Sequence, residues 1–189
     1  MLNKNNHIKS YKLRDIIKNE NICIRNNPEG IDKLWPKSYI EYFYESLFRI
    51  KKFKDQLRIL IEINNTNDNS IHLWKYYLPT LNIYKFKFNN DNLFFDKNYS
   101  PEFLCDIAII NNGNNIKNLN NLIFDILPFL NIDGYLVIED IGLMSKKVIS
   151  SFIKTPLNYE VRLFEFRSKR LILNNSILSI KRSKNKKVL

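Results

Sequence analysis

The sequence is poor in the residues that build disulfide frameworks and histidine- or cysteine-based metal sites. Among 189 residues there are four glycines and only two each of cysteine, histidine, methionine and tryptophan. Cys23 and Cys105 are too few for a disulfide framework, and they predict a reducing compartment such as the cytoplasm. The scattered histidines and cysteines do not have zinc-site spacing. Without a signal-peptide core or an apolar run near the roughly 20 residues of a membrane span, we expect a protein with no membrane partner.

Hydrophobic residues make up 44% of the chain, which predicts a globular core, and the formal net charge is +11. A positive charge of this size is typical of proteins that meet nucleic acid or acidic substrates. The abundance of lysine, asparagine and isoleucine instead indicates a compositional bias that spreads charge over the surface. We predict an extension over 1–29, one domain over 30–182 and a basic tail over 183–189; nucleic-acid binding by that tail rests on charge alone.

The stretch from 104 to 142 is predicted to form a strand, a helix and a second strand. Asp106–Ile110 is an apolar run of strand length, and apolar residues recur at helical spacing over Ile116–Leu130. Asp133-Gly134 reads as a turn before a second buried-strand run, Tyr135–Ile138. A strand, a crossover helix and a second strand predict a right-handed parallel unit.

Polar residues follow both of these predicted strands. Asn111 and Asn112 come after the first, and the adjacent acids Glu139 and Asp140 come after the second. In open parallel sheets, ligands bind beyond the carboxyl ends of the strands. The sequence therefore places any chemistry at these four residues.

The remaining periodicity alternates strands with helices and ends in a hairpin, which predicts an α/β three-layer sandwich with a Rossmann-like, mostly parallel sheet. The expected elements are a helix over 39–51 capped by Ser38, a strand over 57–63, a helix over 71–78 capped by Ser70, strands over 83–88 and 92–95, a helix over 145–153, and hairpin strands over 159–167 and 176–181.

Several short motifs stand in a familiar order along the chain. They are Gly30-Ile31-Asp32-Lys33, Ser38-Tyr39, Ile61-Glu62-Ile63-Asn64, Ser70-Ile71 with Trp74, Ile83-Tyr84-Lys85-Phe86-Lys87, Phe95-Asp96-Lys97-Asn98, Asn111-Asn112-Gly113-Asn114-Asn115 and Asp133-Gly134-Tyr135-Leu136-Val137-Ile138-Glu139-Asp140. This order resembles the class I S-adenosylmethionine-dependent methyltransferases, in particular the macrocin and mycinamicin O-methyltransferase-like branch, which includes cephalosporin hydroxylase-type proteins. The resemblance covers about residues 30 to 182.

The resemblance implies S-adenosylmethionine as cofactor and Glu62, Asn64, Asp96 and Asn111 as the residues that bind it. Two departures affect this expectation. The loop after the first strand has no glycine, although glycine lets the backbone approach a cofactor closely. Lys87 stands where the family has an acid that accepts hydrogen bonds from the ribose, and lysine has no acceptor.

The resemblance also implies that Glu139 and Asp140 are the catalytic acids and that, with the carbonyl of Asn111, they hold Mg²⁺. Magnesium prefers charged oxygen ligands. The two acids that the family carries after the fourth strand are Asn111 and Asn112 here, and the histidine expected near Asn115 is absent.

Three hypotheses for function stay open at this point. The first is a methyltransferase that transfers a methyl group to the oxygen of a small, sugar-like acceptor. The second is a catalytically degenerate member of the fold, retained as a binding or assembly subunit, as the lost glycines and acids suggest. The third is a nucleic-acid-binding or RNA-modifying variant, which rests on the positive charge.

Overall fold

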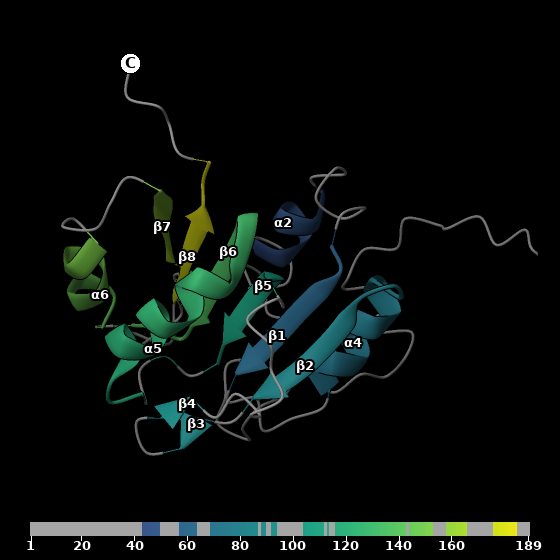
Figure 1. The fold of residues 1–189 in the computed structure, drawn as a ribbon, viewed down its shortest axis with the longest axis horizontal. Helices are drawn as coiled ribbons and strands as arrows, with labels where there is room; N and C mark the ends of the chain where they lie inside the picture. Colours follow the sequence, from purple (N-terminus) through teal and green to yellow (C-terminus); the bar gives the residue numbers. More distant parts are fainter. Residues whose placement is uncertain are drawn as a thin grey trace, which may run out of the picture.

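A computed structural model describes residues 43–49, 57–63, 69–86, 88–89, 92–93, 104–111, 113, 116–142, 144–152, 158–165 and 176–184. Six strands form one sheet in the order β2-β1-β5-β6-β8-β7 (Figure 1). Their bounds are β1 Ile59–Ile63, β2 Asn82–Phe86, β5 Cys105–Ile110, β6 Leu130–Glu139, β7 Tyr159–Glu165 and β8 Ser176–Arg182. The first four pair in parallel, and β8 is antiparallel to both β6 and β7. The predicted α/β fold with a mostly parallel sheet and a closing antiparallel hairpin is confirmed.

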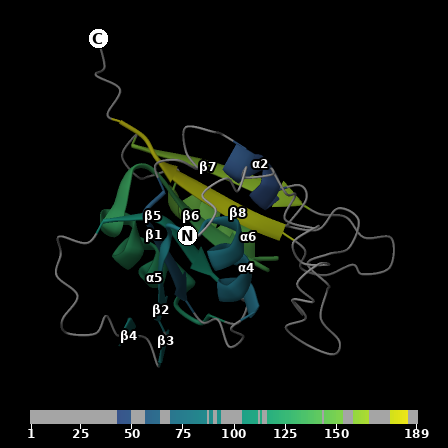
Figure 2. The same ribbon diagram turned by 90° about the vertical axis from the view of Figure 1, so that its right-hand side faces the viewer.

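Helices cover both faces of the sheet and give it three layers. The helices α2 (Glu45–Arg49) and α4 (Asn69–Tyr77) pack on one face. The opposite face is covered by α5 (Leu119–Ile126), with the 3₁₀ turn η3 (Leu127–Phe129) following it, and by α6 (Met144–Phe152). Figure 2 shows α2 and α4 on one side of the strands and α5 on the other.

The central strand β5 divides the core into two halves. Ile107 and Ile109 pack with the α2 and α4 side, whereas Ala108 and Ile110 pack with the α5 side. A strand that is buried on both faces is a continuous apolar run, because successive side chains point to opposite faces. The short apolar run in the sequence therefore identified β5 correctly, with Cys105 buried at its start.

The helix α5 is amphipathic, as its spacing predicted, but it is shorter than expected. Leu119, Leu122, Ile123 and Ile126 are its buried residues. Ile116 is buried ahead of the first turn, and the chain tightens into η3 after Ile126. Of the predicted helix over residues 39–51, the structure describes 43–49 and forms α2 over Glu45–Arg49; the rest of the range and the predicted cap Ser38 lie outside the described residues.

The predicted turn at Asp133-Gly134 is wrong, because β6 runs through both residues. Asp133 has a φ of 66°, and the pairing register jumps from Cys105↔Leu130 to Ile107↔Tyr135. Extra residues in one strand of a pair, with one of them in the left-handed conformation, are typical of a β-bulge. A turn-like dipeptide here marks an irregularity within a strand.

The predicted strand at 83–88 also needs correction, whereas the predicted strand at 92–95 is confirmed over 92–93, with 94–95 outside the described residues. The first is divided into β2 and the short β3 (Phe88–Asn89), and the second is observed as β4 (Asn92–Leu93). β3 and β4 pair with each other antiparallel in a separate two-stranded sheet. Only two residues separate them in the sequence, which is the length of a tight hairpin connection.

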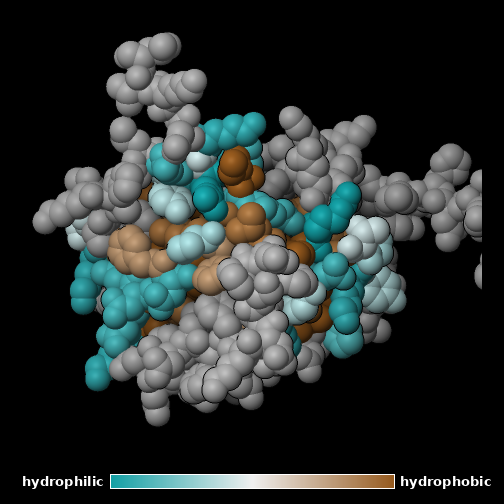
Figure 3. Space-filling model, in the orientation of Figure 1, coloured by the Kyte–Doolittle hydropathy of each residue, from teal (hydrophilic) through white to brown (hydrophobic). Residues whose placement is uncertain are grey.

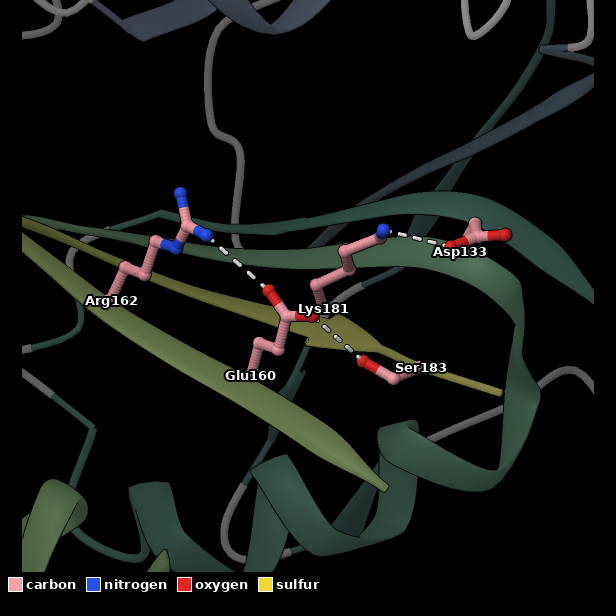
Figure 4. Close-up of polar contacts among 5 residues, drawn as sticks. All are labelled: Asp133, Glu160, Arg162, Lys181 and Ser183. Carbon is pink, nitrogen blue, oxygen red and sulfur yellow. Dashed lines mark hydrogen bonds and ion pairs between the residues drawn. The ribbon is translucent and has the colours of Figure 1, made fainter. Parts of the chain in front are cut away.

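Charged side chains connect β6, β7 and the end of β8 at the edge opposite the carboxyl ends of the parallel strands. The Nζ of Lys181 lies 2.8 Å from Oδ1 of Asp133 (Figure 4). Arg162 pairs with Glu160 at 3.4 Å, and the hydroxyl of Ser183 donates to Glu160 over 3.2 Å. The hydrogen bond to Asp133 raises the pKa of Lys181. Lys181, two residues before the predicted basic tail, is therefore engaged within the fold.

Hydrophobic residues gather toward the middle of the face drawn in Figure 3, with hydrophilic ones around them. Across the described part of the chain, the exposed large hydrophobic residues are Tyr76, Leu104, Phe124 and Ile132. None of the helices that the structure describes is both long and apolar enough to cross a membrane.

Candidate functional site

The carboxyl ends of β1, β5 and β6 meet at one edge of the sheet. Pairing aligns Ile63 of β1 with Ile110 of β5, and Ile110 with Ile138 of β6. From β1 the chain proceeds to β2 on one side, whereas β5 is followed by β6 on the other side. The strand order thus reverses between β1 and β5, and the crevice above such a reversal is where open α/β sheets bind ligands.

Glu62 is the buried acid near the end of β1, and α4 supplies two donors to its carboxylate. The indole Nε1 of Trp74 donates to Oε1 over 2.7 Å, and the hydroxyl of Ser70 donates to Oε2 over 3.0 Å. The side chain is almost completely buried. Because a buried charge is costly without hydrogen bonds, these two donors account for an acid in the core.

Ser70 does not cap α4 as predicted, because the helix begins at Asn69 and Ser70 lies within its first turn. Its hydroxyl is directed to Glu62 instead. Serine is common both at helix caps and as a local hydrogen-bond donor, so spacing alone did not separate the two roles.

Glu139, at the end of β6, is the second buried acid on the same face of the sheet. The hydroxyl of Tyr44, on the turn that leads into α2, donates to its Oε1 over 2.7 Å. Both residues are buried, and Phe43 beside Tyr44 packs edge-on against Phe164 of β7. A hydrogen bond between Tyr44 and Glu139 therefore joins the start of α2 to the carboxyl end of the sheet.

Tyr44 and Trp74 form what we call the aromatic bridge between the two acids. Their ring centroids lie 4.9 Å apart with the rings tilted by 53°. Phe48 packs against both rings. Each bridge residue thus has its apolar body in the core and its polar tip on a carboxylate, the arrangement that buried tyrosine and tryptophan favour.

Asn111 closes the end of β1 from the neighbouring strand. Its backbone N–H donates to the carbonyl of Ile63 over 3.1 Å, and its side-chain Nδ2 reaches the same oxygen at 3.4 Å. The side chain is buried. The strand-end carbonyl of Ile63 is satisfied in this way.

Asp140 lies differently from Glu139 although the two are adjacent. It is half-buried and has a φ of 53°, in the left-handed region. The two following residues are fixed by Ser176 of β8. The carbonyl of Ser176 accepts the backbone N–H of Ile141 over 3.3 Å, and its hydroxyl accepts that of Gly142 over 2.9 Å.

Gly113 lies under this turn. A Cβ at that position would approach Cγ2 of Ile138 to 2.7 Å and the carbonyl oxygen of Glu139 to 3.2 Å. The loop after β5 therefore packs directly against the end of β6, and only a glycine leaves room for that contact. The turn at Asp140 is thus held from β8 on one side and from the β5 loop on the other.

The structure brings Glu62, Asn111, Glu139 and Asp140 to the same edge of the sheet, as their positions at strand ends predicted. The predicted residues Asn64 and Asp96 lie outside the described residues, as do Asn112 and Lys87. His72 is exposed on α4.

The Mg²⁺ set that the resemblance implies, Glu139, Asp140 and Asn111, has two carboxylates and one neutral amide, and the structure gives it no further support. Within the described ranges, no group of three histidine, cysteine, aspartate or glutamate residues is placed to hold a metal ion. The Nδ2 of Asn111 faces the Ile63 carbonyl, and Glu139 accepts from Tyr44. We therefore assign no chemical step to a metal.

Sequence reasoning missed the polar roles of Tyr44, Trp74 and Ser176. Tyr44 and Trp74 are core residues, and no sequence pattern indicated that they donate to Glu139 and Glu62. One signal was available. Tyrosine and tryptophan stand at buried positions that phenylalanine could also fill, and their polar groups need partners, which the acids at the strand ends can provide.

No protein-family model and no curated protein sequence matches the chain. Solved structures do match. MycE, a methyltransferase from the mycinamycin biosynthetic pathway crystallised with Mg and SAH, is similar in two crystal forms. One gives a TM-score of 0.51 at 16% identity, over 77% of this chain and 47% of that one. The other gives 0.60 at 15% identity, over 95% and 55%. The chain thus spans about half the length of MycE.

A second similar structure is a release-factor-specific protein-(glutamine-N5) methyltransferase from Alicyclobacillus acidocaldarius. It gives a TM-score of 0.51 at 11% identity, over 82% of this chain and 98% of that one. At such identities the likeness shows a shared fold and not a shared activity. The substrates of these proteins differ, so the fold does not select an acceptor.

Proposed function

We propose that the chain is an S-adenosylmethionine-dependent methyltransferase that acts on the oxygen of a small hydroxylated, sugar-like acceptor, as in the macrocin and mycinamicin O-methyltransferase-like branch. The observation that carries the proposal is that the acids Glu62, Glu139 and Asp140 gather at the carboxyl edge, beside the point where the strand order reverses between β1 and β5. A free thiol at Cys105 agrees with a cytoplasmic location.

The cofactor is proposed to lie over the ends of β1 and β5. A carboxylate accepts up to about four hydrogen bonds. Ser70 and Trp74 are two donors to Glu62, and the cationic amine of the cofactor's amino-acid end would be a further one. Asn111 would border the same crevice, because it fixes the end of β1 to that of β5. When bound, S-adenosylmethionine supplies a methyl group activated on a sulfonium.

The acceptor is proposed to lie beside the cofactor, over the ends of β5 and β6. There an acid at the end of β6, where Glu139 and Asp140 stand, would orient a hydroxyl group in line with the methyl group. Positioning of two reactants supplies a large part of the acceleration in such transfers. A carboxylate that takes the acceptor's proton as the methyl–oxygen bond forms has to lie within hydrogen-bond reach of it, about 2.6 to 3.2 Å.

A catalytically degenerate binding subunit is the alternative, and one observation favours it. Both buried carboxylates already accept hydrogen bonds from the protein, Glu62 from α4 and Glu139 from Tyr44. Acids used in this way hold helices onto a sheet whether or not a ligand binds. The alternative predicts a stable fold that binds no cofactor.

Calorimetric titration with S-adenosylhomocysteine tests the proposal. We expect micromolar binding to the full chain, and a loss of roughly tenfold or more in Glu62→Gln, because the amide no longer offers a charge to the ligand amine. Asp125→Asn, an exposed acid on α5, is the matched control and should bind as the original protein does. Absence of binding at millimolar ligand would support the degenerate subunit instead.

A further inference from the structure

The two adjacent acids at the end of β6 differ in burial and in backbone conformation. Glu139 is a strand residue whose side chain is almost completely buried beside Tyr44. Asp140 is half-buried and lies just past the strand in the left-handed region. The same edge of the sheet therefore presents two carboxylates in different environments.

Tyr44 explains the burial of Glu139. Its ring is fully buried, packs against Phe48 and Trp74, and carries its hydroxyl to the Glu139 carboxylate over 2.7 Å. To release Glu139 toward a ligand, the chain would have to break a charge-assisted hydrogen bond in the core, which is among the stronger kinds. Glu139 thus serves best as the acid that fastens the start of α2 to the sheet.

The conformation of Asp140 is imposed by its neighbours. Left-handed backbone is unfavourable for residues other than glycine, although aspartate and asparagine tolerate it best. Ser176 fixes the two residues after Asp140 through its carbonyl and its hydroxyl, and Gly113 packs beneath the carbonyl of Glu139. Strained backbone conformations that the surrounding structure maintains are common at ligand-binding positions.

We infer that the two acids have separate roles: Tyr44 keeps Glu139 inside the protein as a structural carboxylate, and Asp140, fixed by Ser176, is the acid that meets the acceptor. Its partner there is a group that donates a proton, a hydroxyl or an amine. Ser176 is then a positioning residue that acts through Asp140. The inference rests on the proposed function, because it assigns the acceptor side of that site.

The location of Asp140 supports this assignment. The crevice above β1 and β5 is the expected cofactor position, and β6 is the next strand beyond β5. The reactive group of the cofactor has to face the acceptor. An acid at the end of β6 therefore lies on the side to which the methyl group is transferred.

The test uses two ligands that differ at one group, so that no acceptor is needed. S-adenosylhomocysteine has no group at the methyl position, whereas sinefungin carries a cationic amine there. We expect the original protein to bind sinefungin roughly tenfold more tightly, as one charge-assisted hydrogen bond implies. Asp140→Asn should abolish that preference and leave the affinity for S-adenosylhomocysteine within about twofold. Asparagine also accepts left-handed backbone, so the turn is kept.

Two further variants separate positioning from structure. Glu139→Gln should keep the preference for sinefungin, because Glu139 does not meet the ligand. Ser176→Ala should reduce the preference while the affinity for S-adenosylhomocysteine is retained, which a purely structural role would not produce.

The outcomes distinguish the inference from the proposed function. If neither ligand binds the original protein, the proposed function fails, and the acceptor-side role fails with it. If both bind but the preference is absent, survives Asp140→Asn, or is lost in Glu139→Gln, the division of roles is overturned while the proposed function stands.

Discussion

The rings of Tyr44 and Trp74 lie 4.9 Å apart, and each residue donates a hydrogen bond to a different buried carboxylate. Through this contact, Glu139 at the end of β6 and Glu62 near the end of β1 are held by one packed aromatic unit. The unit belongs to the core and to the candidate site at the same time. Substitutions of its residues are therefore tested first for their effect on stability.

Replacing Tyr44 with phenylalanine should destabilise the protein only while Glu139 is present. Hydrogen bonds to charged groups contribute about 1.5 to 3 kcal/mol, and a buried carboxylate that loses its donor bears that cost. A double-mutant cycle with Glu139→Leu, followed by urea unfolding, measures the coupling. We expect Tyr44→Phe to be nearly neutral when it is combined with Glu139→Leu. Equal costs in both backgrounds would show that the hydroxyl makes no specific bond to Glu139.

Replacing Trp74 with phenylalanine should lower the free energy of unfolding by about 2 to 5 kcal/mol. The change removes the indole donor to Glu62 and leaves a gap beside Tyr44 and Phe48, so the lost hydrogen bond adds to lost packing. Chemical denaturation monitored by circular dichroism measures it. Tyr76→Phe, an exposed residue of the same helix, is the control and should change stability by less than about 0.5 kcal/mol. Similar effects of the two substitutions would contradict the structural role of the indole.

Asp106 provides a stability variant that is remote from the candidate site. Its Oδ2 accepts the backbone N–H groups of Arg58 and Ile59 at 2.7 and 3.0 Å, and its Oδ1 accepts from Nδ2 of Asn131 at 2.7 Å. These contacts lie at the amino ends of β1 and β5. Asp106→Ala should cost about 1 to 3 kcal/mol, because donors lose their acceptor.

The same variant should bind S-adenosylhomocysteine as the original protein does, when titrated well below its unfolding transition. Asp125→Ala, which removes an exposed acid from α5, should change neither property. A loss of affinity in Asp106→Ala would show that this carboxylate affects ligand binding at the opposite edge of the sheet.

The thiol of Cys105 should contribute a pH-dependent stability above neutral pH. Burial, and to a lesser extent the carboxylate of Asp106, raise its pKa from 9.0 to about 12. The unfolded chain releases this proton near pH 9 and the folded chain does not. The contribution is therefore fully present below the unfolded pKa and is lost as the pH rises toward the folded one, by about 1.4 kcal/mol per unit.

Urea unfolding at about pH 8, 9, 10 and 11, which spans the range from the unfolded pKa toward the folded one, tests this. Cys105→Ala is compared with the original protein at each pH. Lysine and tyrosine titrate in both proteins, so only their difference reports the thiol. The destabilisation caused by Cys105→Ala should shrink once the pH exceeds the unfolded pKa, and a difference that is constant across the series would contradict a buried, protonated thiol.

Gly134→Ala should destabilise the protein by about 1 to 3 kcal/mol through overpacking. The added Cβ would meet the carbonyl oxygens of Asn131 at 2.8 Å and Asp106 at 3.1 Å, and backbone atoms within a sheet do not move aside easily. Thermal unfolding measures the effect. Asn121→Ala, on the exposed face of α5, is the control. Unchanged stability in Gly134→Ala would mean that the irregular start of β6 rearranges.

Local sequence patterns predicted most of the order of the elements and the edge where the polar residues gather. Strand β5 was predictable because a strand buried on both faces is an uninterrupted apolar run, and α5 because its apolar residues recur at helical spacing. Since parallel strands end at one edge, the positions of Glu62, Asn111, Glu139 and Asp140 in the chain already placed them together.

The contacts of those side chains depend on the tertiary structure. Local patterns placed Ser70 at a helix cap and Asp133-Gly134 in a turn, whereas packing turned the serine to Glu62 and carried β6 through the dipeptide. The contact between Tyr44 and Glu139 spans 95 residues of sequence. No local pattern encodes such a bond, because it depends on how a helix and a sheet come to lie against each other.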